Sequence, residues 1–252
     1  MPERLRTARG VGRSLRIYYG DSHRAAAMDK LYARFIKPGD LVFDIGAHVG
    51  DRVAAFRRLG ARVLAVEPQP ALVRALRLLY RRDADVLIEP VAVGSTQGSI
   101  TLNLNIDNPT VSTASAAFIA ASAHASGWEG QTWGEQIDVP MTILDQLISR
   151  HGTPAFVKID VEGFEAEALA GLTQAVPALS FEFTTIQRDV ALASLSRCVA
   201  LGYKHFNAVL GETQTFVHPE WQTAGEIAGW LRELPMAANS GDVYATLDRR
   251  LP

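Results

Sequence analysis

Cysteine is nearly absent from this chain, because Cys198 is the only one among 252 residues. A single cysteine excludes an internal disulfide and any zinc site built from several cysteines. Its apolar, helical surroundings predict a buried thiol rather than a nucleophile. Long apolar runs are lacking as well. No stretch reaches the eighteen or more consecutive apolar residues of a membrane span, and the basic N-terminus lacks the apolar stretch of a secretory signal. We therefore expect a cytoplasmic protein.

An excess of positive charge is also missing. Lys and Arg number 25 and Asp and Glu number 27, for a net charge of −2 at pH 7. A general nucleic-acid binder would show a basic excess. We therefore expect no nucleic-acid partner and no membrane partner.

Apolar residues, by contrast, make up 48% of the chain, enough for one α/β domain with a full core. Apolar runs of strand length recur, with helical patterns between most of them. These runs lie at residues 41–45, 62–66, 85–88, 99–104, 156–159, 179–183, 203–207 and 243–247. Such alternation predicts an α/β, Rossmann-like, doubly wound and mostly parallel sheet. We expect a helical, basic N-terminal extension over residues 1–36 and one domain over residues 37–252.

The segment from Asp44 to Gly50 reads D-I-G-A-H-V-G and joins the first apolar run to a helical pattern. Gly46 permits a tight turn and close approach of the backbone to a ligand, and the following helix offers free N–H groups. The second apolar run ends in Glu67, whose carboxylate can accept hydrogen bonds from both ribose hydroxyls. The turn has two glycines instead of G-x-G-x-x-G, and Asp44 suits a ligand with a free amino group. The pattern favours S-adenosyl-L-methionine (SAM) over NAD.

A second motif, from Lys158 to Glu165, reads K-I-D-V-E-G-F-E. Ligands of open α/β sheets bind beyond the carboxyl ends of the strands, so we expect Asp160 beside the glycine turn. Lys158 lies in a strand, where an unpaired charge is costly, and it should therefore meet a carboxylate such as Glu162 or Glu182. We interpret Glu165 as an acidic residue in the first turn of a helix, favoured by the helix dipole.

These two motifs, with A-V-E-P at the end of the second run, resemble the FkbM-type SAM-dependent methyltransferases. Residues 142–145 (T-I-L-D) are also similar to that family's T-L-D, and the resemblance covers roughly residues 36–185. It implies a class I methyltransferase-like, seven-stranded sheet with a variable insert, about residues 105–136, before the fourth strand. It also implies methyl transfer from SAM, usually to an oxygen of a sugar or natural-product scaffold. Family members commonly carry Asn where this chain has His48.

The resemblance and the motifs together define a candidate site. The residues expected to bind the cofactor are Asp44, Gly46, Ala47, His48, Gly50, Glu67, Pro68, Ala92, Val93 and Asp160. Ala92 and Val93 should lie at the end of the third strand, where adenine would contact apolar surface. A hydroxyl acceptor must lose a proton, which makes Asp160, Glu162 and Glu182 the candidate catalytic residues. We assign no metal. A metal site built on Asp160 and Glu182, as in metal-dependent catechol-type methyltransferases, stays open as an alternative, but it would need a third oxygen ligand that the sequence does not identify.

Other functions stay open at this stage. The chain could be an NAD-dependent oxidoreductase on a Rossmann fold, or a non-catalytic SAM-fold module that contacts another protein. The residues 105–136 are rich in small polar residues, with a weak helix at 116–125, and suit either a substrate lid or a linker. The expected partner is a small-molecule or glycan acceptor. The tryptophans, expected to be exposed, would suit a hydrophobic substrate pocket or a homodimer interface; they are Trp128, Trp133, Trp221 and Trp230.

Overall fold

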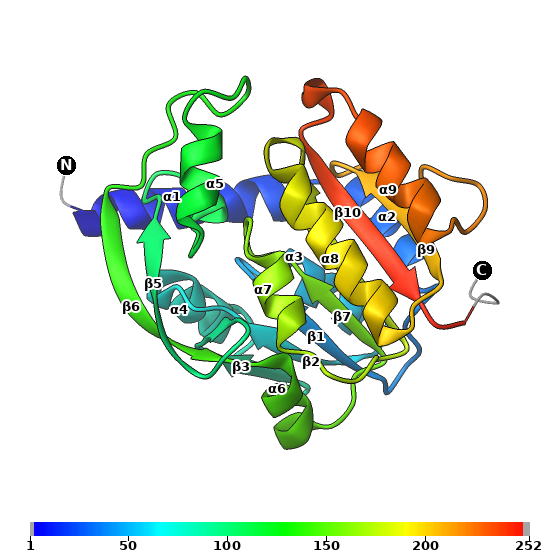
Figure 1. The fold of residues 1–252 in the computed structure, drawn as a ribbon. Helices are drawn as coiled ribbons and strands as arrows, with labels where there is room; N and C mark the ends of the chain where they lie inside the picture. The colour runs from blue at the N-terminus through cyan, green and yellow to red at the C-terminus, as the bar shows by residue number, and fades with distance from the viewer. Residues whose placement is uncertain (1–2, 249–252) are drawn as a thin grey trace.

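Seven strands form the central sheet, in the order β3-β2-β1-β7-β8-β10-β9 (Figure 1). The computed structural model describes residues 3–248, and side chains from residue 5 onward; residues 1–2 of the expected extension lie outside this range. The strands are β1 (Leu41–Ile45), β2 (Arg62–Val66), β3 (Val86–Glu89), β7 (Phe156–Ile159), β8 (Ala178–Thr184), β9 (His205–Leu210) and β10 (Ser240–Thr246). Only β10 runs antiparallel to its neighbours. The expected doubly wound, mostly parallel, seven-stranded sheet is confirmed.

The position of β1 beside β7 decides where a ligand can bind. From β1 the chain winds outward through β2 and β3, and it then returns to the centre at β7 and winds the other way. Strands β1 and β7 are parallel, with Asp44 opposite Lys158. The two loops that follow these strands therefore leave the same edge in opposite directions. This is the switch point at which open α/β sheets hold ligands.

Two apolar cores cover the two faces of the sheet because successive strand residues point to opposite sides. Val42 packs in the core formed with α2 and α3, and the next residue, Phe43, packs in the core formed with α6 to α9. The helices of the first face are α2 (Ser22–Tyr32), α3 (Asp51–Arg58) and α4 (Pro70–Leu79). Those of the second face are α6 (Leu144–His151), α7 (Glu165–Ala170), α8 (Arg188–Leu201) and α9 (Ala224–Glu233). Cys198, fully buried on α8, is the structural thiol that its context predicted.

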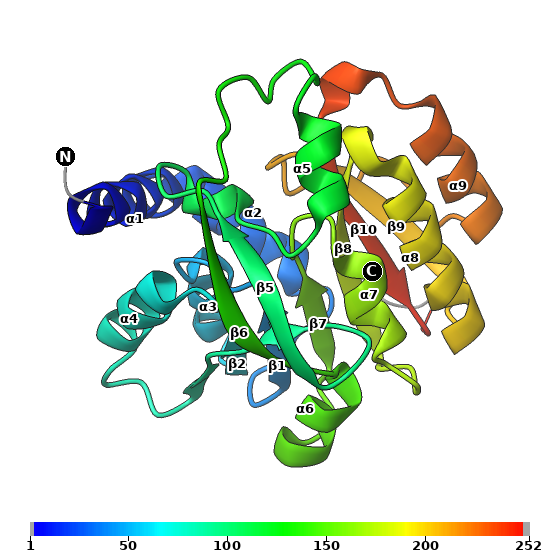
Figure 2. The ribbon, with the colours of Figure 1, turned by 60° about the vertical axis from the view of Figure 1, so that its left-hand side comes forward.

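A second, three-stranded sheet lies beside the first, in the order β4-β6-β5 (Figure 2). Its strands are β4 (Ala92–Val93), β5 (Gly98–Leu104) and β6 (Glu135–Thr142). The expectation that Ala92 and Val93 end the third strand is wrong, because β3 stops at Glu89 and β4 pairs with Met141 and Thr142 of β6. A two-residue strand carries too little pattern to reveal its partner from sequence.

The insert between β5 and β6 is folded onto the domain. It contains the short 3-10 helix η1 (Pro109–Val111) and helix α5 (Ala116–Ser122), and two further 3-10 turns are η2 (Thr185–Gln187) and η3 (Met236–Ala238). The expected exposure of the tryptophans is wrong. Trp128 is 9% exposed, packs on Phe118 and donates to Asn239 Oδ1, and Trp133, Trp221 and Trp230 are partly buried.

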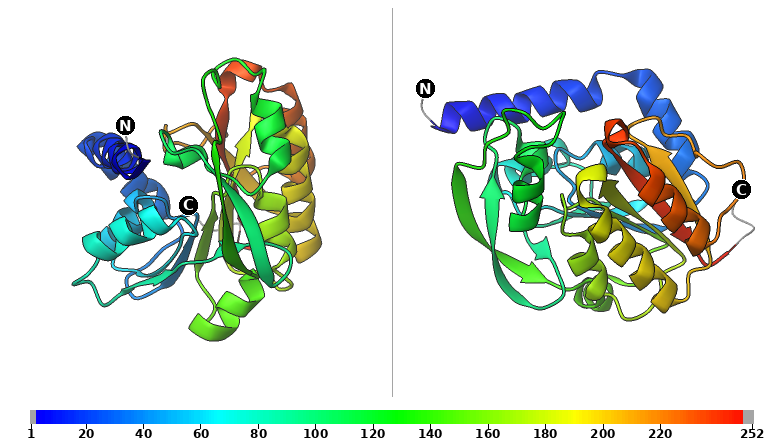
Figure 3. Two further views of the ribbon diagram at one scale, coloured as in Figure 1. Left: turned by 90° about the vertical axis from the view of Figure 1, so that its left-hand side faces the viewer. Right: turned by 45° about the horizontal axis from the view of Figure 1, so that its top comes forward.

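The N-terminal helix α1 (Glu3–Tyr19) runs along one edge of the molecule past α4 and η1 (Figure 3). Gly10 allows this close packing, since a Cβ there would lie 2.7 Å from the Ile106 carbonyl oxygen. The C-terminal end of α1 thereby lies near the carboxyl ends of β1 and β7. Within residues 3–248, no helix has the length and hydropathy needed to cross a bilayer.

Candidate functional site

A pocket lies at the carboxyl ends of β1, β2 and β7, bordered by the second sheet, η1 and the end of α1. Nine of the ten residues expected to bind a cofactor line it: Asp44, Gly46, Ala47, His48, Glu67, Pro68, Ala92, Val93 and Asp160. The tenth, Gly50, does not. It caps the N-terminus of α3 with φ +82° and lies against Leu76 and Tyr80, so it contributes to the shape of the turn.

The glycine turn packs directly on the loop that follows β7. Gly46 has φ +83°, and a Cβ on it would lie 1.8 Å from the carbonyl oxygen of Asp160. The backbone N–H groups of Gly46 and Ala47 both donate to the carbonyl of Val66, at 2.9 and 3.0 Å. These contacts require glycine at position 46 for two independent reasons, a left-handed backbone and the absence of space.

Glu67 ties the end of β2 to the glycine turn. Its carboxylate accepts hydrogen bonds from the backbone N–H of His48 at 2.9 Å and of Gln69 at 2.8 Å. The side chain is 3% exposed, and burial raises its pKa to about 8, against the lowering effect of these two bonds. Each oxygen keeps a further lone pair that can accept from a ligand.

Asp44 presents a buried oxygen that lacks a partner. The residue is 1% exposed, and its Oδ2 makes no hydrogen bond within the described part of the chain. Burial, and next the charge of Asp51, raise its pKa to about 7, whereas the nearby Lys158 lowers it. Buried polar atoms are normally hydrogen-bonded. Because Asp44 lines the pocket, its unpartnered carboxylate oxygen suits a hydrogen-bond donor of a ligand.

Two segments outside the sequence motifs, α1 and η1, form the wall of the pocket next to His48. Tyr18 of α1 packs edge-on against the His48 ring, with ring centroids 5.4 Å apart. Thr110 of η1 lies with its Oγ1 3.4 Å from His48 Nε2. Burial lowers the pKa of His48 to about 4, so the ring is neutral at pH 7. Nothing local marks Tyr18 or Thr110 as site residues, because both reach the site through long-range packing.

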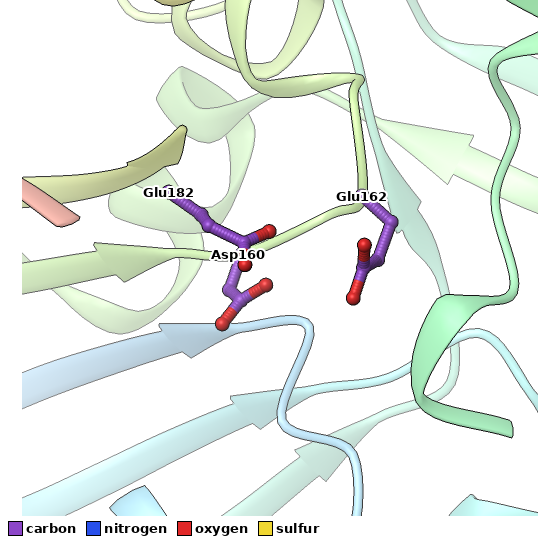
Figure 4. A group of neighbouring side chains, drawn as sticks. All are labelled: Asp160, Glu162 and Glu182. Carbon is purple, nitrogen blue, oxygen red and sulfur yellow. The ribbon is translucent and has the colours of Figure 1, made fainter. Parts of the chain in front are cut away.

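Three carboxylates converge beside the glycine turn, as Figure 4 shows for Asp160, Glu162 and Glu182. One oxygen from each lies within 4.8 Å of the others. We call these three residues the carboxylate cluster. Burial and then the charge of Asp160 raise the pKa values of Glu162 and Glu182 well above the usual range. The pKa of Asp160 is lowered although burial opposes this, because Lys158 stabilises its charged form.

Lys158 pairs with partners other than those expected. Its Nζ donates to Asp160 Oδ2 at 3.1 Å and to Asp242 Oδ1 at 2.6 Å, and the expected ion pair with Glu162 or Glu182 is wrong. Asp242 lies on β10, 84 residues further along the chain. Only the pairing of β10 with β8 brings it there, and no local pattern could have revealed it.

Glu165, in the first turn of α7, also binds the backbone of the loop that follows β7. Its Oε1 accepts hydrogen bonds from the backbone N–H groups of Val161 at 3.0 Å and of Gly163 at 3.2 Å, and the residue is 2% exposed. Glu165 therefore fixes the loop that carries Asp160 and Glu162.

A network of ion pairs forms part of the pocket wall. Arg52 donates to Asp51 at 2.5 Å and to Glu212 at 3.0 Å, and Arg24 of α2 contacts the same two carboxylates at 2.9 Å each. Asp51, Arg52 and Glu212 line the pocket, but sequence reasoning did not select them. Two arginines balance two acids here, so neither arginine is left to neutralise another acid of the pocket.

Comparison with known proteins adds a family. A model described as "Methyltransferase FkbM domain" matches residues 44–234, which include both sequence motifs and the carboxylate cluster. No curated protein matches the chain.

Several solved structures are distantly similar to this chain. One is a precorrin-6y C5,15-methyltransferase from Geobacter metallireducens, with 12% identity, coverage of 88% of this chain and 86% of that one, and a TM-score of 0.43. A SAM-dependent O-methyltransferase from Thermotoga maritima has 11% identity, coverage of 88% and 64%, and a TM-score of 0.43. An Aeropyrum pernix fibrillarin with natively bound SAM has 10% identity, coverage of 83% and 67%, and a TM-score of 0.42. At these scores, the similarities add nothing to the sheet order described above.

Proposed function

We propose that this protein, which belongs to the FkbM family of methyltransferases and uses SAM as its cofactor, methylates a hydroxyl oxygen of a small-molecule or glycan acceptor. One observation supports oxygen as the acceptor atom more than any other. The carboxylates of Asp160 and Glu162 line the same pocket as Asp44 and Glu67. Groups able to receive a hydroxyl proton thus border the pocket in which the cofactor would bind.

The groups of the pocket fit SAM chemically. The unpartnered oxygen of Asp44 suits the ammonium group of the cofactor. Glu67 would accept hydrogen bonds from the ribose hydroxyls with the lone pairs left by its two backbone bonds. Ala92 and Val93, both nearly buried, offer apolar surface to adenine. When bound, SAM supplies a methyl group on a positively charged sulfur, which is activated for direct displacement.

The carboxylate cluster would act on the acceptor. Most of the rate can come from holding the hydroxyl in line with the methyl group, and its proton must be accepted. Lys158 holds Asp160 in place and ionised, so that Asp160 can accept a hydrogen bond from the acceptor hydroxyl and orient it. Burial and the charge of Asp160 raise the pKa values of Glu162 and Glu182, so Glu162, which lines the pocket, would take the hydroxyl proton only in its ionised form. Glu182 is not among the residues that line the pocket.

The charge of the pocket supports SAM over NAD. Its ionisable lining, apart from Tyr18 and His48, consists of six acids and one arginine: Asp44, Asp51, Glu67, Asp160, Glu162, Glu212 and Arg52. Arg52, the one arginine among these lining residues, is already paired with Asp51 and Glu212, so none of them offers a free positive charge to the pyrophosphate of a dinucleotide. An NAD-dependent oxidoreductase is therefore disfavoured.

The test is a transfer assay with methyl-labelled SAM. Hydroxylated sugars and phenols are compared with amine analogues of the same scaffolds, and the methyl position in the product is assigned by NMR. We expect an O-methyl product, with kcat reduced at least a hundredfold in Asp160→Asn while S-adenosylhomocysteine (SAH) still binds. The exposed Glu167→Gln variant on α7 removes a nearby charge outside the pocket and serves as the control.

Two results would contradict the proposal. N-methyl products alone would exclude oxygen as the acceptor atom. Tight SAH binding without transfer to any member of the panel would favour the non-catalytic SAM-fold module.

A further inference from the structure

We propose that Asp160, Glu162 and Glu182 form a binding site for one divalent cation, of the magnesium or manganese type, that holds the acceptor oxygen. The role of the ion rests on the proposed function, whereas the binding site itself can be tested without any acceptor. The structure supplies in Glu162 the third oxygen ligand that sequence analysis could not identify.

The geometry of the carboxylate cluster suits a single ion. Asp160 follows the end of β7, Glu162 follows two residues later, and Glu182 projects from the neighbouring strand β8 (Figure 4). One oxygen from each lies within 4.8 Å of the others. Mg²⁺ binds oxygen at about 2.0–2.1 Å, so two ligands on opposite sides of one ion lie about 4 Å apart, and side-chain rotation can bring oxygens that lie within 4.8 Å of one another to that separation. All three carboxylates can therefore reach the same ion.

A second observation, independent of this clustering, is the lack of N–H donors to the two glutamates. Glu162 is only 8% exposed, its carboxylate points into the cluster, and no N–H group of the described residues donates to that carboxylate. Glu182 is partly buried and its side chain hydrogen-bonds Asp160, but its Oε2 atom is buried and has no partner among the described residues. Two other buried acids of this region behave differently, since Glu67 and Glu165 each accept two backbone N–H groups. Buried carboxylates are normally paired or coordinate metals.

The charges around the carboxylate cluster are compatible with a bound divalent cation. Asp160 and Asp242 both pair with Lys158. The single positive charge of the lysine neutralises one of the two carboxylates, so one negative charge remains. Glu162 and Glu182 have no cationic partner of their own in the described part of the chain, and burial and the charge of Asp160 raise their pKa values, so a divalent cation would take the place of their protons. A cluster of this charge, with oxygen ligands alone, matches the preference of magnesium and manganese and not that of softer metals.

The ion would contribute directly to the proposed reaction. Asp160 and Glu162 line the pocket, so an ion held by them would lie within reach of an acceptor hydroxyl bound there. A hydroxyl bound there loses its proton to solvent more readily, because the cation stabilises the resulting negative oxygen. The oxygen then forms a bond to the methyl carbon as the carbon–sulfur bond breaks. The bonding pair goes to sulfur, which leaves a methyl ether and neutral SAH.

The test measures metal binding separately from activity. Full-length protein, stripped of metal by a chelator, is titrated with MnCl₂ by calorimetry and by electron paramagnetic resonance, and competition with MgCl₂ follows. We expect one Mn²⁺ per chain, with affinity reduced at least tenfold in Glu162→Gln and in Glu182→Gln. Glu167→Gln should bind Mn²⁺ like the unmodified protein, because this exposed residue lies outside the cluster.

SAH titration and thermal unfolding of the same samples establish that the variants are folded and able to bind cofactor. The absence of saturable Mn²⁺ binding at millimolar concentration would overturn the site and would favour a proton shared between the carboxylates. Equal Mn²⁺ affinity in Glu162→Gln and the unmodified protein would overturn it as well. Failure of SAH to bind would instead count against the proposed function, so the two ideas fail separately.

Discussion

Lys158 Nζ lies 2.6 Å from Asp242 Oδ1, although 84 residues separate the two along the chain. Lys158 is 1% exposed in the central strand β7, and Asp242 is 6% exposed in β10. This ion pair spans the intervening strand β8 and supplies a cation next to the carboxylate cluster. It therefore supports both the fold and the ionised state of Asp160.

Lys158→Met should strongly destabilise the protein. The substitution leaves the buried Asp242 and the partly buried Asp160 without their cation, and breaking a buried ion pair by removing one partner costs about 3–5 kcal/mol. Urea unfolding at neutral pH measures the change. Lys204→Met is the control, because Lys204 is exposed. A loss of less than about 1 kcal/mol for Lys158→Met, in the range of a surface substitution, would contradict the prediction.

Glu67→Gln should weaken SAH binding by about 1–3 kcal/mol, because the amide leaves one oxygen in place of two to accept hydrogen bonds from the backbone and the ribose. Gln is preferable to Ala here, since its side-chain oxygen can still accept one of the two backbone N–H groups that Glu67 binds. Calorimetric titration with SAH checks the affinity, and thermal unfolding checks the fold. Unchanged affinity in a folded variant would show that Glu67 serves only the glycine turn.

The stability of the cofactor-free protein should depend on the ionisation of Glu67. Its pKa is raised from 4.5 to about 8 in the folded state, so the folded chain holds a proton that the unfolded chain releases between these values. The stabilisation is full below pH 4.5, falls as the pH rises, and is lost above about pH 8. For one proton the slope is at most about 1.4 kcal/mol per pH unit. Glu67→Gln should remove this component, which urea unfolding of both proteins from about pH 5 to about pH 8.5 will test; parallel pH profiles would refute it.

Gly46→Ala should destabilise the protein much more than Gly39→Ala. Both glycines have a positive φ, of +83° and +88°, so alanine is strained at either position by about 1–2 kcal/mol. The two positions differ in the free space around an added Cβ. A Cβ at position 46 meets the Asp160 carbonyl at 1.8 Å, whereas nothing lies within 4 Å of one at position 39. Chemical denaturation of both variants isolates the steric cost, and equal losses would argue against the close packing of the turn on the β7 loop.

The sequence by itself determined the parallel sheet and much of the candidate pocket. Strand and helix patterns are local, because side chains alternate along a strand and repeat every 3.6 residues along a helix. The glycine turn after β1 and the acid after β2 are also local, and the winding of an α/β sheet brings them together whatever the surrounding loops do. For that reason local patterns are enough to assign Asp44, Gly46, Glu67 and Asp160 to one site, and all four line the pocket.

The tertiary structure alone decided the contacts that depend on packing between distant segments. The partner of Lys158 is set by the antiparallel insertion of β10, and the cover over His48 by the docking of α1 and η1. Glu162 joins Asp160 and Glu182 because the loop after β7 places it at φ +54°, a backbone conformation uncommon for glutamate. Such contacts follow from how whole elements pack, and a local residue pattern holds no information about them.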